Sequence, residues 1–212
     1  MPRTADHDER RDRIARALLR AVARKGLART TMADVADEAG ASVGMVQRYF
    51  RSKKELLRFG VEYLYGRGAE RLDEVELRPP FDDLILRLTE TLLPLDEERR
   101  TELTVWLEFL PATITDPDLA GLHRETTHHL VDGFAQAFTR AREAGTFPAA
   151  YDPTEEAVAL VALVDGLTMH HLVGSDHFGA DRIRAALSTH IDRLLGPAGG
   201  TGPTDTRPGG EQ

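Results

Sequence analysis

The apolar positions of this chain recur with the period of an α-helix along almost its whole length. Near the N-terminus, Ile14, Leu18, Ala21 and Val22 share one face of a helix that should end near Gly26. No stretch of the sequence combines strict apolar–polar alternation with the β-branched residues typical of strands. The pattern therefore predicts an all-α fold.

Start and stop signals divide the rest of the chain into further helices. Ser52 and Glu55 have the spacing of a capping box, which predicts a long helix from Ser52 to about Val75 that Pro79-Pro80 would end. More helices are expected at about 81–93, 97–110, 117–143, 154–173 and 180–195. The Gly/Pro-rich segment 196–212 is expected to be a disordered tail.

One stretch, TTMADVADEAGASVGMVQRYFRSKKELL, predicts two short helices joined by a tight turn, followed by the long one. Thr31 would cap the first helix and Ser42 the second. Gly40 would end the first helix in the left-handed conformation that such a turn demands. Ala36 is small enough for a close helix crossing, and Val46 would anchor the second helix. This spacing predicts a helix-turn-helix that presents its second helix to a DNA groove.

The charge is distributed unevenly along the chain. The formal net charge is −8, yet residues 1–60 contain 14 basic and 8 acidic residues. The remaining 152 residues contain 13 basic and 27 acidic ones. A basic module attached to an acidic body is the asymmetry expected when one end of a protein meets phosphate.

Several classes of protein are excluded or disfavoured by composition. The chain has no cysteine, which excludes disulfides and thiolate metal sites. The sequence has no signal-like N-terminus and no run approaching roughly 20 apolar residues, so a soluble cytoplasmic protein is expected. The adjacent pairs His128-His129 and His170-His171 point in different directions on a helix and would not chelate a metal together. Neither a metal site nor a cofactor is expected.

The quoted stretch resembles the DNA-binding domain of TetR-family transcriptional regulators over about residues 10–60. The later stretches LLPLDEERRTELTVWLEFL, ITDPDLAGLHRE and ALVALVDGLTMHHLVG are more weakly similar to the C-terminal domain of the family's BetI-like branch. The resemblance implies an all-helical homodimer, with a helix-turn-helix domain at 1–52 and a ligand-binding and dimerisation domain at 53–195. It also implies a repressor that a small molecule releases from a near-palindromic operator. The branch's named member responds to choline, a property that does not transfer with the fold.

Carried over position by position, the resemblance implies a set of DNA contacts: Thr31, Ser42, Val43, Gly44, Gln47, Arg48, Tyr49 and Lys53. Thr31 and Ser42 cap exposed helix N-termini, which attract phosphate. Tyr49 and Lys53 match positions that contact the DNA backbone, where Lys53 adds positive charge.

The remaining positions would read the bases. Val43 would touch a thymine methyl group, and Gly44 would let the backbone approach the DNA. Family members commonly have tyrosine at the position of Gln47, which is followed here by Arg48. Gln47 can bond an adenine edge, and Arg48 either guanine or a phosphate. This departure leaves the operator sequence open.

The basic residues before the first core position allow two interpretations. Arg3, Arg10, Arg11 and Arg13 would form an arm that reaches phosphate, or they belong to a solvated helix start. Interleaved acidic residues favour the solvated helix.

Aromatic and apolar stripes in the C-terminal part allow either core packing or a ligand pocket. The candidate lining residues are Trp106, Phe109, Leu110, His123, Phe134, Phe138, Asp165 and Met169. An aromatic side chain beside a carboxylate suits an organic cation, but acidic residues are too abundant here for that argument to decide the ligand.

The segment VALVALVDGLTMHHLV is apolar nearly all round and must be buried on more than one side. Gly166 would allow another helix to approach it closely. With the last helix, which carries Ile183, Leu187, Ile191 and Leu194, it is the expected dimer interface. The alternative is that these residues form a monomer's internal core.

Two other functions remain to be weighed against a regulator. The first is a helical enzyme, but the sequence has no Ser/His/Asp constellation, phosphate loop or HExxH motif. The second is a protein-interaction module that has lost DNA binding, which the intact Thr31, Gly44 and Lys53 argue against. We therefore predict a DNA-binding regulator that is not an enzyme.

Overall fold

A computed structural model of the protein describes residues 2–174 and 176–195, all of whose regular structure is helical. The helices are α1 (Pro2–Lys25), α2 (Met32–Ala39), α3 (Val43–Tyr49), α4 (Lys53–Asp73), α5 (Phe81–Glu90), α6 (Glu97–Thr115), α7 (Pro117–Glu143), α8 (Pro153–Val173) and α9 (Ala180–Leu195), with a 3-10 turn at Asp176–Phe178. This confirms the expected all-α fold. The expected tail, 196–212, lies outside the described residues.

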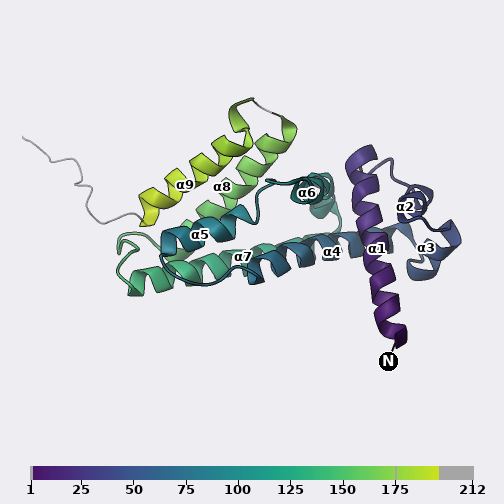
Figure 1. Cartoon of the computed structure of the whole chain (residues 1–212), viewed down its shortest axis with the longest axis horizontal. Coiled ribbons are helices and arrows are strands. Elements are labelled where there is room, and N and C mark those ends of the chain that lie inside the picture. Colours follow the sequence, from purple (N-terminus) through teal and green to yellow (C-terminus); the bar gives the residue numbers. More distant parts are fainter. Residues whose placement is uncertain (1, 175, 196–212) are drawn as a thin grey trace, which may run out of the picture.

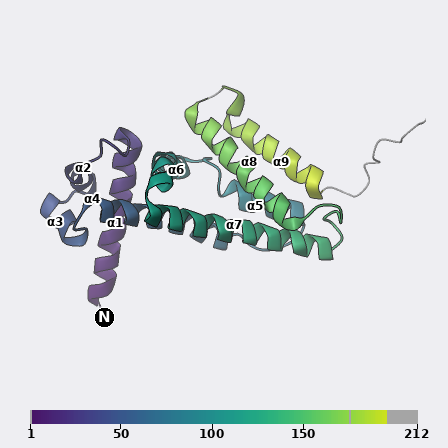
Figure 2. The same cartoon turned by 180° about the vertical axis from the view of Figure 1, so that it is seen from behind.

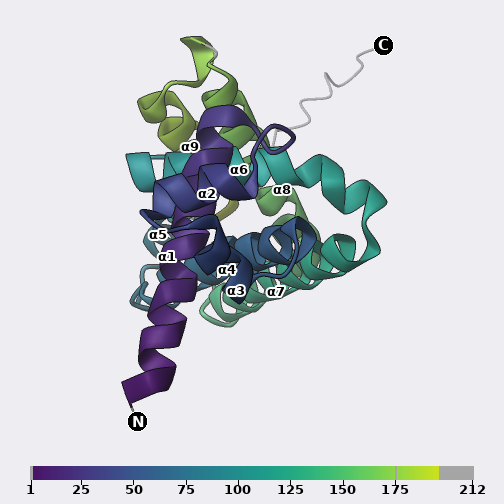
Figure 3. The ribbon, with the colours of Figure 1, turned by 90° about the vertical axis from the view of Figure 1, so that its right-hand side faces the viewer.

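The molecule has two parts, which we call the head (α1–α3) and the body (α4–α9). Figure 1 shows the head at one end, with α4 running from it alongside the other helices of the body. The view from behind shows α7 lying along the length of the body (Figure 2). Seen from the head end, α1 crosses in front of the other helices and its N-terminus projects past α3 (Figure 3).

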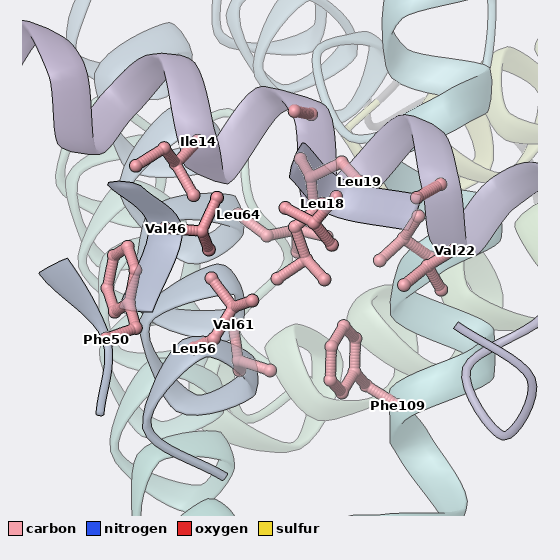
Figure 4. Packing of buried hydrophobic residues seen from close by; sticks show 14 of the residues in the cluster. Ile14, Leu18, Leu19, Val22, Val46, Phe50, Leu56, Val61, Leu64 and Phe109 are labelled. Carbon is pink, nitrogen blue, oxygen red and sulfur yellow. The ribbon is translucent and has the colours of Figure 1, made fainter. Parts of the chain in front are cut away.

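The head is organised around α1. Ile14, Leu18 and Val22 are buried on one face of α1 and pack with Val46 of α3 and Phe50 just after it. Figure 4 shows these side chains meeting others from α4 and α6 in one cluster. The periodicity of the first helix therefore does mark its buried face.

Two helices of the body differ from the sequence prediction. α5 ends at Glu90 rather than near Leu93. α6 was expected to stop at Leu110, but it continues through Pro111 to Thr115. Proline has no backbone N–H to donate, yet the helix continues past it, and the next residue, Ala112, packs against the head's core.

The last helix corrects the expected dimer interface. Ile183, Leu187, Ile191 and Leu194 are buried in the protomer's own core. α9 packs there against α5 and α8. These four side chains are therefore not available to a second copy, and the alternative interpretation as an internal core is correct for them.

The apolar helix α8 behaves differently from α9. Among the described residues it is the one helix long and apolar enough, by length and composition, to cross a membrane. This corrects the expectation that no segment approaches such a length. Because α8 packs against α7 and α9, and a core helix meets the same criteria, the finding is weak evidence for a membrane span.

Candidate nucleic-acid interface and ligand cavity

Helix α3 is built so that one face is anchored and the other is presented to solvent. Val46 is fully buried beneath it, while Val43, Gly44, Gln47 and Arg48 are exposed. The Ser42 hydroxyl accepts a hydrogen bond from the Met45 backbone N–H at 3.2 Å, which caps the helix as the sequence predicted. The exposed face of α3 is therefore held rigidly on the surface of the head.

The turn before α3 has the geometry that the sequence predicted. Gly40 adopts φ 60° and ψ 39°, the left-handed conformation in which glycine carries no steric penalty. Its backbone N–H bonds to Asp37 O, and Ala36, which is buried, supplies the close contact between helices.

The N-terminus of α2 is closed by a reciprocal cap. The Asp34 N–H donates to Thr31 Oγ1 at 3.2 Å, and the Thr31 N–H donates to Asp34 Oδ2 at 2.9 Å. A hydrogen bond from Lys25 and these bonds from Thr31 lower the pKa of Asp34 to about 2. Asp34 therefore stays charged, and the cap stays formed, at neutral pH.

The cap of α4 is only half of the expected capping box. Ser52 Oγ accepts from the Glu55 N–H at 3.1 Å. The Glu55 carboxylate, however, accepts from the Arg51 N–H at 2.8 Å. The start of α4 is therefore tied to the residue before its cap.

Of the other expected DNA-contacting residues, Thr31 and Tyr49 belong to the head, and Lys53 is the first residue of α4. Thr31 and Lys53 are exposed, and Lys53 Nζ lies 3.4 Å from Leu27 O. Tyr49 is half-buried, because its ring packs on that of His7 with centroids 4.8 Å apart. The exposure of Thr31 and Lys53 agrees with the expected DNA contacts.

The start of α1 is helical and partly packed. The Arg11 guanidinium lies over the Phe59 ring, 4.4 Å from its centroid, and 5.5 Å from that of Phe50. Arg10 and Arg13 are exposed on the same helix. Of the two interpretations of these arginines, a helix start fits the backbone better than an extended arm.

A cavity of about 890 Å³ opens between α4, α5, α6, α7 and α8. At one end, four side chains converge from four different helices: Tyr65 of α4, Trp106 of α6, His123 of α7 and Asp165 of α8. The Tyr65 hydroxyl lies 2.8 Å from His123 Nδ1, within hydrogen-bond distance. This end combines aromatic rings with a single carboxylate.

The electrostatics of that end follow from burial. Protein atoms around the Asp165 carboxyl raise its pKa to about 6, although the residue is exposed by its accessible surface and borders both the cavity and the hollow beside it. Burial lowers the pKa of His123 below 6.5 and raises that of Tyr65 to about 12. At neutral pH the cluster is therefore a carboxylate beside a neutral imidazole and a neutral phenol.

Most of the expected lining residues are placed together. Trp106, His123, Phe134 and Asp165 line the cavity. A smaller adjoining hollow of about 290 Å³ shares Trp106, His123 and Asp165 and adds Leu110 and Met169.

Two expected lining residues lie elsewhere. Phe109 is buried in the head's core, and Phe138 is stacked on Phe147 in the body's core, with centroids 5.2 Å apart. Phe138 lies one turn after the cavity-lining Phe134 on the same face of α7, and Phe109 lies three residues after the cavity-lining Trp106 on α6. An apolar stripe alone could not separate the lining residues from the core residues.

Sequence reasoning missed three polar groups of the cavity wall. Tyr65 follows no motif on α4, so no signal could have found it. Glu102 lies one turn before Trp106 on α6 and pairs with Arg71 at 2.7 Å. Thr168 lies one turn after Asp165 on α8; it is 2 % exposed, and its hydroxyl has no hydrogen-bond partner among the described residues. The spacing of Glu102 and Thr168 from expected residues was a usable signal.

Comparison with known families identifies both parts of the chain. Residues 14–58 match the family of bacterial regulatory proteins named after TetR. Residues 82–196, more than half of the chain, match the C-terminal domain of BetI-type transcriptional repressors. The chain belongs to the TetR family. It is a DNA-binding transcriptional regulator with a BetI-like C-terminal domain, and the proteins it matches are regulators rather than enzymes.

Individual relatives agree over nearly the full length. The regulator PksA of Bacillus subtilis is 26% identical over 195 residues, covering 92% of this chain and 94% of PksA. The regulator BetI of Stenotrophomonas maltophilia is 26% identical over 199 residues, covering 92% of this chain and 97% of BetI.

Solved structures show the same architecture. A Rhodococcus transcriptional regulator is 29% identical with a TM-score of 0.78, covering 87% of this chain and 95% of its own. A Saccharomonospora viridis regulator in complex with choline is 26% identical with a TM-score of 0.81, covering 87% of this chain and 96% of its own. At least one regulator that is similar to this chain in fold and sequence thus binds a small molecule.

Proposed function

We propose that this TetR-family regulator is a homodimeric repressor, released from a near-palindromic operator when an organic cation binds beside Asp165. The observation that carries the proposal is the pairing of an exposed recognition helix with a large cavity in one protomer. The proposed division is a DNA-binding domain at 1–52 and a ligand-binding and dimerisation domain at 53–195, in a cytoplasmic protein.

The eight positions on the head supply the DNA contacts of the proposal. Gln47 and Arg48 are exposed on α3, where they can reach base edges. Thr31, Ser42, Tyr49 and Lys53 would contact phosphates, and Val43 and Gly44 would lie closest to the bases. Phosphate contacts make binding strongly dependent on salt.

The dimer would form through the exposed face of α8. Val158, Ala162, Met169 and Val173 follow one another on that face, and Val158 and Val173 are 52% and 77% exposed. Leaving such an apolar stripe in water is unfavourable, and a second copy would cover it. Two recognition helices related by a two-fold axis would then match a near-palindromic site.

The class of effector follows from the cavity. Among the described residues, Asp165 has no ion-pair partner. Trp106, Tyr65 and His123 line the cavity around it. Aromatic faces and an unpaired carboxylate favour a positively charged ligand. The choline bound to the Saccharomonospora relative supports this class. A volume of about 890 Å³ is in the upper range for drug-sized ligands, so the effector is expected to be bulkier than choline.

DNA binding is tested by selecting genomic fragments that the protein retains at low salt. We expect sub-micromolar binding to a near-palindromic fragment, with affinity falling by orders of magnitude as salt rises from roughly 50 to 200 mM. Failure to retain any fragment, including the DNA upstream of its own gene, would overturn the proposal.

The effector class is tested by titrating choline and tributylamine while following operator release. Asp165→Asn should abolish the response to both cations. Glu125→Gln is a matched control, because Glu125 also lines the cavity but is exposed at its edge. Two outcomes would show that the effector is not a cation. In the first, operator release by the cations survives Asp165→Asn. In the second, the wild type is released by organic anions and by neither cation.

A further inference from the structure

Helix α6 is shared between the cavity and the head. Glu102, Leu103 and Trp106 line the cavity. Val105 and Phe109, on the other face of the same helix, are buried in the cluster built around α1. Figure 4 shows Phe109 pointing into the group that contains Val22 and Val61. Any displacement of α6 by a ligand therefore acts directly on the head's core.

A specific hydrogen bond ties α6 to the turn between α1 and α2. The Leu27 backbone N–H donates to Glu108 Oε2 at 2.9 Å. Glu108 lies two residues after Trp106 and so belongs to the turn of α6 next to the cavity. The two bonded residues are 81 positions apart in sequence, so this contact joins the head directly to the body.

The turn beside that carboxylate favours glycine. Gly26 has φ +79°, a conformation that other residues rarely adopt, and a Cβ there would be in van der Waals contact with Glu108 Oε2, 3.4 Å away. The carbonyl of Leu27 also faces Lys53 Nζ at 3.4 Å. Both backbone polar groups of Leu27 are thus held by residues of the body, four residues before Thr31, the N-cap of α2.

A second contact fixes the far end of α6. Asp116 ends α6 and caps α7, accepting from the Asp118 N–H at 3.0 Å. Its carboxylate also pairs with Lys54 at 3.1 Å, and this hydrogen bond lowers the pKa of Asp116. Lys54 adjoins the expected DNA-contacting Lys53. The segment of α6 from Glu108 to Asp116 is therefore attached at both ends near the expected DNA-binding surface.

We propose that the state of the cavity reaches the helix-turn-helix through α6 by the bond between the Glu108 carboxylate and the Leu27 N–H, in addition to any movement of α4. The inference rests on the proposed function, because it assumes that the cavity controls DNA binding. Glu108 acts as a positioning residue that touches neither ligand nor DNA. Coupling between two sites is reciprocal, so DNA bound at the head must alter the cavity through the same bond.

Reciprocity allows a test that needs no effector. Trp106 is the single tryptophan of the sequence and lines the cavity, so its fluorescence reports on the cavity while an operator fragment is titrated. We expect a DNA-induced change in the wild type and in Glu97→Gln, an exposed carboxylate at the start of the same helix. Most of this fluorescence change should be lost in Glu108→Ala, because the coupling between the two sites is reciprocal, while operator affinity stays close to that of the wild type.

A conservative variant separates positioning from a general structural role. The amide oxygen of Glu108→Gln can still accept from the Leu27 N–H, so this variant should retain most of the fluorescence change. Glu108→Met, similar in length but without that acceptor, should behave like alanine even if the alanine variant folds poorly. Hydrogen exchange at the Leu27 amide should accelerate in the alanine and methionine variants only.

The possible outcomes distinguish this inference from the proposed function. If no DNA fragment binds, the proposed function fails and the coupling fails with it. If DNA binds but Trp106 does not respond in the wild type, or responds equally in Glu108→Ala and Glu108→Met, the function stands and the proposed route is overturned.

Discussion

In the head apolar side chains meet one another, whereas in the body many of them surround a cavity. Ala15, Ala17 and Ala21 are fully buried along α1, which brings the helices of the head close together. In the body, Thr168 is buried at the cavity wall, and its hydroxyl lacks a hydrogen-bond partner among the described residues. Such groups are costly when left unpaired.

The difference separates two requirements of a regulator. The head must hold α3 in one orientation, and dense packing with capped helix ends provides this. Under the proposed function the body must change when a ligand binds, and a ligand that bonds to the unpaired Thr168 hydroxyl would gain a hydrogen bond there. The four predictions below test this contrast, from the largest expected effect to the smallest.

Removing a large side chain should lower the free energy of unfolding far more in the head than at the cavity. Phe50 is fully buried, so Phe50→Ala should lower the free energy of unfolding by about 3–5 kcal/mol. Trp106 is half-buried beside an existing void, so Trp106→Ala should cost only about 1 kcal/mol. Denaturant unfolding measures both, and similar costs would contradict the contrast.

Two glycines of α4 provide a matched pair. A Cβ at Gly60, near the head, would lie 2.4 Å from Leu18 Cδ2, whereas one at Gly68, in the cavity wall, would meet nothing within 4 Å. Gly60→Ala should cost about 1 kcal/mol after its gain in helix propensity, because of overpacking. Gly68→Ala should instead stabilise the protein by about 0.5–1 kcal/mol. Thermal unfolding of both variants gives the comparison, and two shifts of the same sign would weaken it.

Within the head, the turn and the DNA-facing helix should respond differently to the same change. Gly40→Ala places alanine at positive φ and should cost about 1 kcal/mol. Gly44 is helical, with nothing within 4 Å of its Cβ position, so Gly44→Ala should stabilise the fold by a similar amount. If DNA approaches this backbone, Gly44→Ala should nevertheless weaken operator binding. Undiminished binding would remove Gly44 from the DNA interface.

The smallest expected effect is a pH dependence from Asp165. Its pKa is raised from 3.8 to about 6, so the folded protein retains a proton between these pH values that the unfolded chain releases. Stability from this group is therefore lost as pH rises from about 4 to 6. Asp165→Asn should remove that loss.

The measurement is the difference in unfolding temperature between wild type and Asp165→Asn from pH 4.5 to 7.5. The difference isolates Asp165 from His123, which titrates nearby in both proteins. The unfolding temperature of the wild type should fall relative to that of the variant up to about pH 6, and above this pH the two temperatures should change in parallel. A constant difference would mean that the carboxyl is well hydrated.

The sequence predicted the head almost completely and the body only in outline. Gly40, Ser42 and Thr31 act within a few residues of themselves, so local rules were sufficient for them. The faces of α6 and α9 depend on which helices pack beside them, so Phe109 and Ile183 were assigned to the wrong surroundings. The contact between Glu108 and Leu27 joins distant parts of the chain, and no local pattern could have indicated it.

The junction of α6 and α7 has a mechanical consequence. Asp116 is the single residue between the two helices, and it serves as the end of one and the cap of the other. With a longer loop, α7 could rotate without moving α6. Here a single residue leaves little chain to absorb such a rotation, so a ligand that tilted α7 at the cavity would be expected to move the end of α6 with it.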